Sequence, residues 1–338
     1  MSETPRFADP APAAAPGEDS RIDHGDHGDR DSAMRAARAA AKALCAGQQI
    51  PDACLLMVAT PIGNLADVGL RTLAMLQRCD LVAAEDTRAA QRLLQAWGLS
   101  LPLLRADRHR EQEAAQQVLA QLREGRRVAF VSDAGTPGIR DPGAVLARSA
   151  RAAGYAVLAL PGPSAVTTAL SASGIDLEAG YVFAGYIPAT EGRRRDFLAE
   201  ALGHARTVVC FETPHRIEST VEWLQRLAPQ RKLLLAKELS KQFETYVDGD
   251  AAALLQWLRT DPRHAQGEFV LLIGADAEVA GADLPLQARR WALRLAREMP
   301  ASRACALAAE MSGAPRRELY RWLLLQPAGH GRADDASQ

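Results

Sequence analysis

The sequence lacks the short motifs that identify several large classes of enzyme. It has no Gly-x4-Gly-Lys-Ser/Thr stretch, which argues against a P-loop NTPase. Its first apolar run is not followed by Gly-x-Gly-x-x-Gly, so neither a nicotinamide site nor an ordinary Rossmann-type methyltransferase site is supported. No Gly-x-Ser-x-Gly elbow points to a hydrolase of the α/β type. The chemistry of this chain must therefore come from other segments.

An excess of one charge is also missing, as are long apolar runs. The 40 Lys and Arg residues nearly balance the 41 Asp and Glu residues, so any contact with nucleic acid must come from a local basic patch. No run of 18 apolar residues is present, and Pro161-Gly162-Pro163 breaks the most apolar stretch, so we expect no membrane span. The first residues do not combine a basic region with an apolar core, which is the pattern of a secretory signal. We therefore expect a cytoplasmic protein.

Cysteines are few, and they are not spaced as metal ligands. The count is five, which is odd. This pattern is typical of reduced thiols in the cytosol, and we expect neither disulfides nor a metal site. The five are Cys45, Cys54, Cys79, Cys210 and Cys305.

Three apolar runs that end in turns of Gly, Pro and small residues are the most informative feature of the chain. They occupy residues 56–65, 128–137 and 157–165. An apolar strand, a Gly/Pro turn and then a helix is the way in which α/β domains begin. Open α/β sheets bind ligands at the carboxyl ends of their strands, so three such turns predict one cleft built from several strand ends.

The alternation of apolar runs and helical patterns predicts two α/β domains. In the first, over residues 51–176, it predicts a parallel, doubly wound sheet. Its expected strands are 55–60, 80–84, 127–132 and 156–160, and its expected helices are 68–78, 87–97, 110–124, 143–153 and 164–172. The pattern changes near residue 180, which predicts a second domain over residues 177–278. Its expected strands are 181–183, 207–211, 232–236, 245–247 and 268–273, and its expected helices are 193–203, 215–227 and 250–259.

The two ends of the chain differ from this body. Residues 1–50 are expected to be a disordered extension, because the first 33 are acidic and poor in apolar side chains; 34–47 would be helical if ordered. Residues 285–326 are expected to form a basic, all-helical appendage, since eight arginines against three glutamates leave a net charge of +5. Within it, residues 302–326 follow a helix-turn-helix-like pattern. The tail, 327–338, is expected to be disordered.

Seven segments of the sequence resemble the ribosomal RNA small-subunit methyltransferase I family, within the tetrapyrrole-methylase-like superfamily. They occur in family order and cover roughly residues 55–275. The segments are VATPIGNLADV (58–68), AAEDTR (83–88), VSDAGTPGIRDPG (131–143), LPGPSAVTTALSASG (160–174), FETPHR (211–216), AKELSKQFE (236–244) and GEFVLLIG (267–274). The resemblance implies a two-domain tetrapyrrole-methylase-like fold that holds S-adenosylmethionine between its domains. It also implies a homodimer that methylates the 2′-hydroxyl of a cytidine in 16S rRNA, within the 30S subunit near the decoding centre.

The turns supply the candidate cofactor-binding residues. Gly135 tolerates a positive φ, and small side chains around it let the backbone approach a ligand; an ordinary strand-to-helix connection is the alternative. Ser164 belongs to the second ligand loop that the resemblance implies, although it also suits a helix N-cap. The second domain would contribute strand ends. The full candidate set is Pro61, Asp133, Ala134, Gly135, Thr136, Pro137, Ser164, Ala165, Phe211, Glu212 and Gly267.

Activation of a ribose hydroxyl needs a group that removes its proton. Glu85 and Asp86 follow a predicted strand directly, and we assign them as candidate catalytic residues with Arg88 as a phosphate ligand. An Asp N-cap with an ion pair on the same helix is the alternative. His109 is a second candidate base, in a segment (107–111) where the resemblance is weaker: Asp107 and Arg110 depart from the family pattern, while His109 and Glu111 match it.

Two further questions stay open at this level. Arg193, Arg194 and Arg195 form either a phosphate-binding patch or an ordinary solvated face. The function itself has two alternatives, a C-methyltransferase of tetrapyrrole precursors and a non-catalytic ribosome-assembly factor on the same fold.

Overall fold

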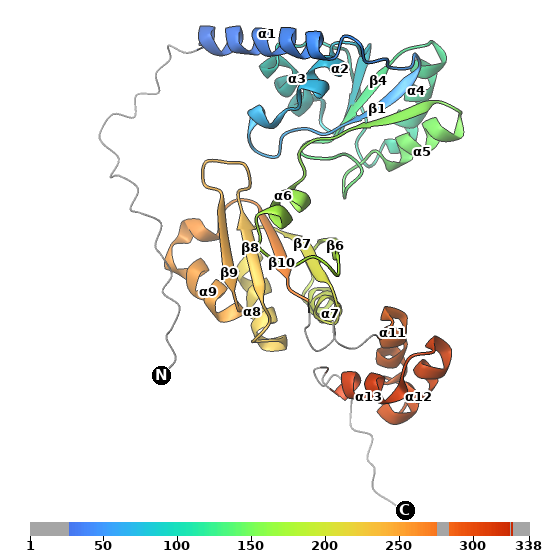
Figure 1. The fold of residues 1–338 in the computed structure, drawn as a ribbon, viewed down its shortest axis with the longest axis vertical. Coiled ribbons are helices and arrows are strands. Elements are labelled where there is room, and N and C mark those ends of the chain that lie inside the picture. Colours follow the sequence, from blue (N-terminus) through green and yellow to red (C-terminus); the bar gives the residue numbers. More distant parts are fainter. Residues whose placement is uncertain (1–26, 276–283, 325, 327–338) are drawn as a thin grey trace, which may run out of the picture.

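The computed structural model describes residues 27–275, 284–324 and 326, arranged as two α/β bodies and a helical appendage in a row (Figure 1). The first body contains a five-stranded parallel sheet in the order β3-β2-β4-β1-β5. Its strands are β1 (Cys54–Val58), β2 (Leu81–Ala84), β3 (Leu103–Arg105), β4 (Val128–Val131) and β5 (Ala156–Leu160). This confirms the predicted parallel sheet. The unpredicted β3 is only three residues long, too short to show a period.

Helices cover both faces of this sheet, which explains the continuous apolar runs of its strands. One face packs against α2 and α3, and the other against α4 and α5. Glu111, at the start of α4, caps the N-terminus of α5. Its carboxylate accepts hydrogen bonds from the amides of Gly143 (2.7 Å) and Val145 (3.1 Å). The helices are α2 (Leu70–Leu76), α3 (Thr87–Ala96), α4 (Glu111–Arg123), α5 (Ala144–Ala152) and α6 (Ala165–Ser171), with a short 3₁₀ turn at Leu65–Asp67.

The second body contains a mixed sheet in the order β6-β7-β10-β8-β9. Only β6 and β7 are parallel. Its elements are β6 (Tyr181–Tyr186), α7 (Glu191–Leu202), β7 (Thr207–Glu212), α8 (Ile217–Leu227), β8 (Leu233–Lys237), β9 (Thr245–Gly249), α9 (Ala251–Thr260), a 3₁₀ turn (Pro262–Ala265) and β10 (Phe269–Ile273). Helices α7, α8 and α9 cover one face.

Helix α6 covers the other face and joins the two bodies. Val166, Ala169 and Leu170 pack against strand residues of the second sheet that include Val209 and Leu272. The ribbon shows α6 between the two bodies, directly above the second sheet (Figure 1). The first body therefore contacts the second sheet through α6, the helix that follows its last strand.

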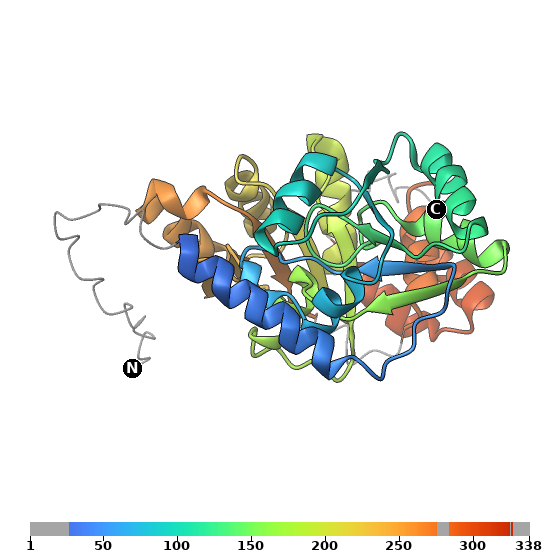
Figure 2. The same cartoon turned by 90° about the horizontal axis from the view of Figure 1, so that it is seen from above.

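The expectation of a disordered segment is wrong for residues 27–50. Residues His27–Leu44 form helix α1, which runs along the outside of the first body (Figure 2). Met34, Ala37 and Ala41 recur at helical spacing and pack into the first core, and Ile50 is buried there too. The prediction from composition missed this apolar stripe, because most of its members are alanine, which is only weakly hydrophobic. Residues 1–26 and the tail expected to be disordered, 327–338, lie outside the described residues.

Deleting residues 1–50 is accordingly expected to lower the free energy of unfolding by at least about 2 kcal/mol, since the burial of Ile50 alone contributes about that much. Urea denaturation measures the loss. A deletion of residues 1–26 is the matched comparison, because it keeps α1 and Ile50 in place. Equal stability of the two deletions would contradict a packed α1.

The appendage is all-helical, as predicted. It consists of α11 (Leu286–Leu295), α12 (Ala301–Ser312) and α13 (Arg316–Leu324), packed around a small core that includes Cys305 and Trp322. Helix α12 ends at Gly313, whose φ of 72° reverses the chain toward α13. Arg289 donates to the carbonyl of Gly203 (2.9 Å) at the end of α7 and so ties the appendage to the second body.

All five cysteines are unpaired and buried, which confirms the expected free thiols. Among the described residues, no helix has the length and apolar character needed to cross a membrane.

Candidate functional site

The three predicted turns lie side by side at the carboxyl ends of β1, β4 and β5. Thr60 and Gly135 exchange backbone hydrogen bonds of 2.9 and 3.0 Å, and the hydroxyl of Thr136 donates to the carbonyl of Pro163 (3.0 Å). The loops that follow three separate strands are therefore bonded into one unit, as the sequence pattern predicted.

These loops contain small residues because they pack closely against one another. Gly135 has a φ of +75°, and a Cβ at this position would lie 3.3 Å from Cγ2 of Ile62. A Cβ on Gly162 would lie 2.8 Å from Cβ of Ala59, a separation that real Cβ atoms do not adopt. Larger residues at either position would force the loops apart.

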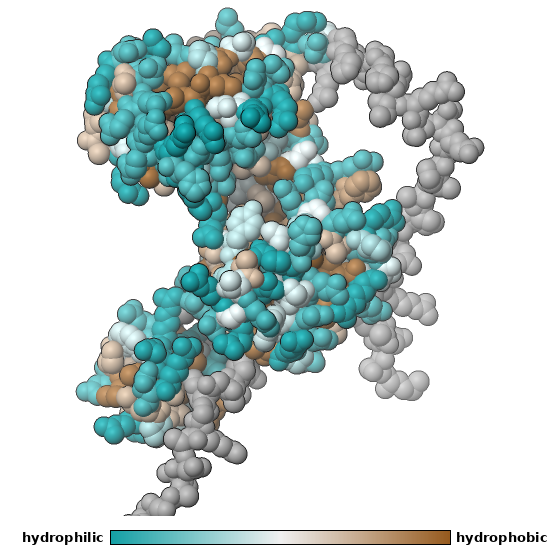
Figure 3. All heavy atoms as spheres, turned by 180° about the vertical axis from the view of Figure 1, so that it is seen from behind, coloured by the Kyte–Doolittle hydropathy of each residue, from teal (hydrophilic) through white to brown (hydrophobic). Residues whose placement is uncertain are grey.

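A cavity of about 520 Å³ lies between these loops and the second body. Its size is typical of small-molecule sites. The space-filling view shows a waist between the two bodies (Figure 3). The lining residues are Ile62, Glu85, Asp133, Ala134, Gly135, Thr136, Ile139, Asp141, Ser164, Ala165, Val166, Tyr186, Phe211, Glu212, Thr213, Pro214, Leu239, Glu268, Phe269 and Val270.

Most of the candidate residues lie together here. Of the cofactor set, Pro61, Pro137 and Gly267 are not among the lining residues, and the other eight are. Of the catalytic set, Glu85 lines the cavity, whereas Asp86 and Arg88 do not. Sequence reasoning missed Asp141 and Tyr186. The predicted strand 181–183 stopped short of Tyr186, which is the last residue of β6.

Gly267 has a packing role in this structure. Its φ is +91°, and a Cβ there would lie 2.5 Å from Oε1 of Glu238. That carboxylate accepts hydrogen bonds from the amide of Glu268 (2.8 Å) and from Nζ of Lys241 (2.9 Å). The glycine therefore makes room for a side chain of its own domain, and its contact with a cofactor stays a prediction.

Glu85 stands in a cluster of carboxylates on the first-body side of the cavity. Burial raises its pKa above the ordinary glutamate value, and the nearby charges of Asp133 and Asp141 raise it further. Burial and Asp133 raise the pKa of Asp141 in the same way. A carboxylate with a raised pKa accepts a proton more readily, which suits a general base.

Asp86 has the helix-capping role that was its alternative interpretation. Its carboxylate accepts a hydrogen bond from the amide of Arg88 (2.8 Å) at the start of α3, and this bond lowers its pKa. The Arg88 and His109 side chains are exposed, and neither lines the cavity. The Glu111 carboxylate accepts the hydrogen bonds at the N-terminus of α5 described above. Of the candidate bases named from the sequence, Glu85 alone lines the cavity.

Two arginines stand beside the carboxylates. Arg108 favours the charged form of Glu85, and its guanidinium reaches the carbonyl of Arg140 (3.5 Å). The Arg140 side chain lies over Gly185, where an added Cβ would be 2.2 Å from its Nε. Since Gly185 belongs to β6, Arg140 extends from the first body across to the second. Both arginines are exposed, so both are available to an anionic ligand.

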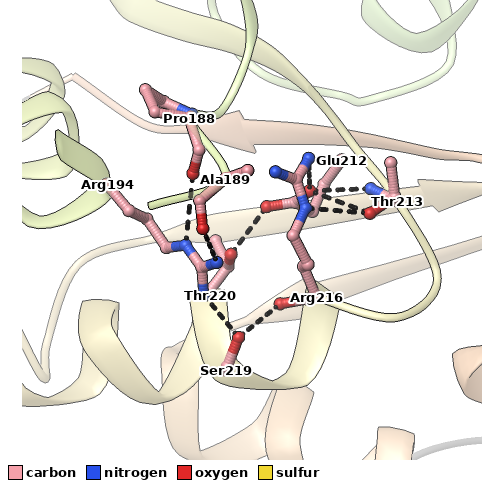
Figure 4. Close-up of polar contacts among 8 residues, drawn as sticks. All are labelled: Pro188, Ala189, Arg194, Glu212, Thr213, Arg216, Ser219 and Thr220. Atoms are coloured by element: carbon pink, nitrogen blue, oxygen red, sulfur yellow. Dashed lines mark hydrogen bonds and ion pairs between the residues drawn. The ribbon is translucent and has the colours of Figure 1, made fainter. Parts of the chain in front are cut away.

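Glu212 makes its polar contacts with its own domain. Its Oε1 accepts hydrogen bonds from the amide of Thr213 (2.7 Å) and from Arg216 (2.7 Å), and its Oε2 accepts one from Thr220 (2.7 Å). Figure 4 shows this carboxylate enclosed by those groups. Glu212 thus fixes the turn between β7 and α8, and only the surface of this turn remains for a ligand.

The patch interpretation of residues 193–195 is wrong for Arg194. Only 7% of this residue is exposed. Its guanidinium donates to the carbonyls of Pro188 (3.4 Å) and Ala189 (2.9 Å) and to the hydroxyl of Ser219 (2.6 Å), as Figure 4 shows. Arg194 fastens the chain before α7 to α8 and does not face solvent.

We expect Arg194→Ala to lower the free energy of unfolding by about 2–3 kcal/mol, because two carbonyls and a hydroxyl lose a charged donor in a buried place. Arg195→Ala is the matched control. Within the described residues Arg195 forms its ion pair with the exposed Asp196, so its loss should cost less than about 0.5 kcal/mol. Chemical denaturation of both variants measures the difference, and equal losses would contradict the assigned role.

Comparison with known proteins adds a second line of observation. A family model described as Tetrapyrrole (Corrin/Porphyrin) Methylases matches residues 55–255, and one described as the RsmI C-terminal HTH domain matches residues 282–326. The Ribosomal RNA small subunit methyltransferase I of Neisseria meningitidis serogroup B is 40% identical over 275 residues, which cover 81% of this chain and 94% of that protein. The protein of the same description from Escherichia coli O157:H7 is 42% identical over 274 residues, covering 80% and 95%.

Among solved structures, a uroporphyrin-III-C-methyltransferase from Thermus thermophilus is 20% identical. It aligns with a TM-score of 0.47 over 68% of this chain and 96% of that one.

Proposed function

Because the chain belongs to the ribosomal RNA small subunit methyltransferase I family, we propose that it transfers a methyl group from S-adenosylmethionine to the 2′-hydroxyl of a cytidine in 16S rRNA, near the decoding centre of the 30S subunit. The observation that carries the proposal is the position of Glu85. Its partly buried carboxylate lines the same cavity as the bonded loops at the ends of β4 and β5.

The residues of the cavity fit this cofactor. Ile62, Val166 and Val270 offer an apolar wall for an adenine ring, and small residues such as Ala134 and Ala165 leave backbone groups within reach of a ligand. The acidic residues of the cavity favour a ligand that carries positive charge, as a sulfonium and an ammonium group do. When bound, S-adenosylmethionine would supply an electrophilic methyl group.

The residues beside Glu85 suit an RNA acceptor. Arg108 and Arg140 would hold phosphates, which positions the ribose without selecting a base. Tyr186 is 49% exposed, and its ring is braced edge-on by Phe211 with 5.3 Å between centroids. An unstacked base can lie on such a ring. Glu85 would then accept the proton of the 2′-hydroxyl, because an alcohol is a poor nucleophile until it loses that proton.

Methyl transfer from tritiated S-adenosylmethionine tests the proposal. The purified protein is incubated with 30S subunits that lack the modification, with free 16S rRNA and with a tetrapyrrole precursor, and the labelled nucleoside is then identified. We expect label on the 2′-oxygen of one cytidine. Label on the precursor would replace our proposal with the C-methyltransferase alternative. Binding to subunits without transfer to any acceptor would favour the assembly factor.

A homodimer in the cytoplasm completes the proposal. The homodimer rests on the family resemblance alone, and light scattering on the purified protein tests it. The cytoplasmic location is supported by five buried thiols without a disulfide, which is typical of reducing compartments.

A further inference from the structure

Helix α13 presents a continuous exposed face of basic and aromatic residues. Its exposed members recur at positions that share one side of a helix, while Leu319, Trp322 and Leu323 point into the core of the appendage. Glu318 is exposed as well, but helical spacing places it outside this side of the helix. The members of this side are Arg316, Arg317, Tyr320, Arg321 and Leu324. We call the surface formed by these five residues the α13 face.

Folding does not account for the charge of this face. In the described part of the appendage, the ion pairs join Arg290 to Glu200 and Arg294 to Glu298, so no arginine of the α13 face takes part in one. Arg316 and Arg317 lie in the first turn of the helix, where the helix dipole disfavours positive charge. The two arginines thus oppose helix stability, and an anionic partner would explain their presence.

The exposed apolar side chains of the α13 face indicate which class of anionic partner it would bind. Tyr320 is 37% exposed and Leu324 is 63% exposed, next to arginines that form no ion pair within the described residues. A surface that combines free guanidinium groups with an exposed aromatic ring matches RNA, whose phosphates take the charge and whose unpaired bases stack on the ring. The deep, narrow major groove of A-form RNA does not admit a helix, so the contact would be with phosphates and a loop or bulge.

The position of the appendage separates this surface from the cavity. It lies at the end of the second body that faces away from the first body (Figure 1). A polynucleotide bound there and in the cavity would need to extend along the second body. We infer that the α13 face is a second RNA-docking surface, which binds 16S rRNA at a place remote from the methylated nucleotide. This inference rests on the proposed function for the identity of the RNA.

Two contacts on one RNA raise the effective concentration of the acceptor at the cavity without taking part in the reaction. Loss of the α13 face should therefore raise KM for the 30S subunit and leave kcat unchanged. Cofactor affinity should also stay unchanged, because no residue of α13 lines the cavity.

A triple variant, R316Q/R317Q/R321Q, tests the inference in the full-length protein. We expect the log–log slope of 16S rRNA binding against salt to fall by about two to three units, since each lost phosphate contact removes about 0.7–0.9. The charge-matched control is R294Q/R297Q/R303Q, which removes three exposed arginines from α11, from the turn after it and from α12. It should keep most of the slope. Equal effects of both variants, or no effect of the first, would overturn the inference.

The aromatic contact has its own test. Tyr320→Ala should weaken RNA binding by between about fivefold and a hundredfold, and Tyr320→Phe should restore it, because stacking needs the ring and not the hydroxyl. If both variants bind like the wild type, no base stacks there. A change of oligomeric state with unaltered RNA binding would instead assign the face to a protein partner and overturn the inference.

These measurements separate the inference from the proposed function. RNA binding is measured without cofactor, so it does not depend on methyl transfer. Wild-type protein that binds 16S rRNA through α13 but transfers no methyl group would contradict the proposed function alone. Wild-type protein that methylates the RNA while the triple variant retains the same KM would contradict the inference alone.

Discussion

Glu85→Gln is expected to lower kcat for methyl transfer by about 10²–10⁴-fold, the usual contribution of a general base. The amide keeps the size of the side chain but cannot accept the proton of the acceptor hydroxyl. Cofactor affinity should change little by comparison. Single-turnover measurements with saturating acceptor isolate this effect from product release.

The neighbouring residue provides the control. Asp86→Asn changes an exposed carboxylate that caps α3, and asparagine caps helices as well as aspartate does. We expect near-normal turnover from this variant and from His109→Ala. If either loses activity as Glu85→Gln does, the geometric argument for Glu85 is wrong. Asp141→Asn should also be measured, since Asp141 shares the cavity.

The pH profile gives an independent check on Glu85. A general base works when it is deprotonated, so the rate falls as pH drops through its pKa. Burial, Asp133 and Asp141 raise the pKa of Glu85, which places this acid limb at a higher pH than an ordinary glutamate would give. Glu85→Gln should abolish the limb. An unchanged limb in the variant would assign it to another group.

Gly135→Val is expected to abolish measurable binding of S-adenosylmethionine. At a φ of +75° a β-branched residue is strained, and its side chain would press on Ile62 in the wall of the cavity. Either the loop moves and breaks its bridge to Thr60, or the side chain occupies space that the ligand needs. Isothermal titration calorimetry measures the loss.

Gly125→Val separates backbone strain from effects in the cavity. Gly125 has a φ of +81°, but a Cβ there would meet nothing within 4 Å. Both variants should lose stability of the same order, about 1–2 kcal/mol from the left-handed backbone. Only Gly135→Val should lose the cofactor. If Gly125→Val also fails to bind, the defect is global, and it says nothing about the loop.

Much of the fold follows from pattern alone. The central strands β1, β2 and β4 are buried on both faces, so they appear as unbroken apolar runs. The alternation of strands with helices then leaves few possible topologies. The apolar stripe of α1 was overlooked because alanine carries little weight in any hydropathy pattern. Strand β3 was overlooked because three residues cannot display a period.

The site was predictable to the extent that it consists of strand ends in one sheet. Gly135, Thr136 and Ser164 met as expected, because parallel strands deliver their loops to one edge. Asp141 lies in the first body, within the segment 131–143 that resembles the family, and could have been chosen. The role of Tyr186 depends on how the second body is placed against the first, which no local pattern contains. Tyr186 reaches the cavity only because α6 rests on the second sheet. Arg194 was grouped with its exposed neighbours in the sequence, whereas its guanidinium is buried against Ser219. Glu238 occupies the space beside Gly267, and a contact of this glycine with a cofactor stays a prediction.

Helix α6 is at once part of the binding loop and part of the joint between the bodies. It starts at Ala165, in the loop that lines the cavity, and its next turns lie on the second sheet. The shape of the cavity and the angle between the two bodies therefore both depend on the position of α6. A substitution in α6 would therefore disturb the wall of the cavity and the packing between the two bodies at once, which a substitution in the Gly135 loop would not.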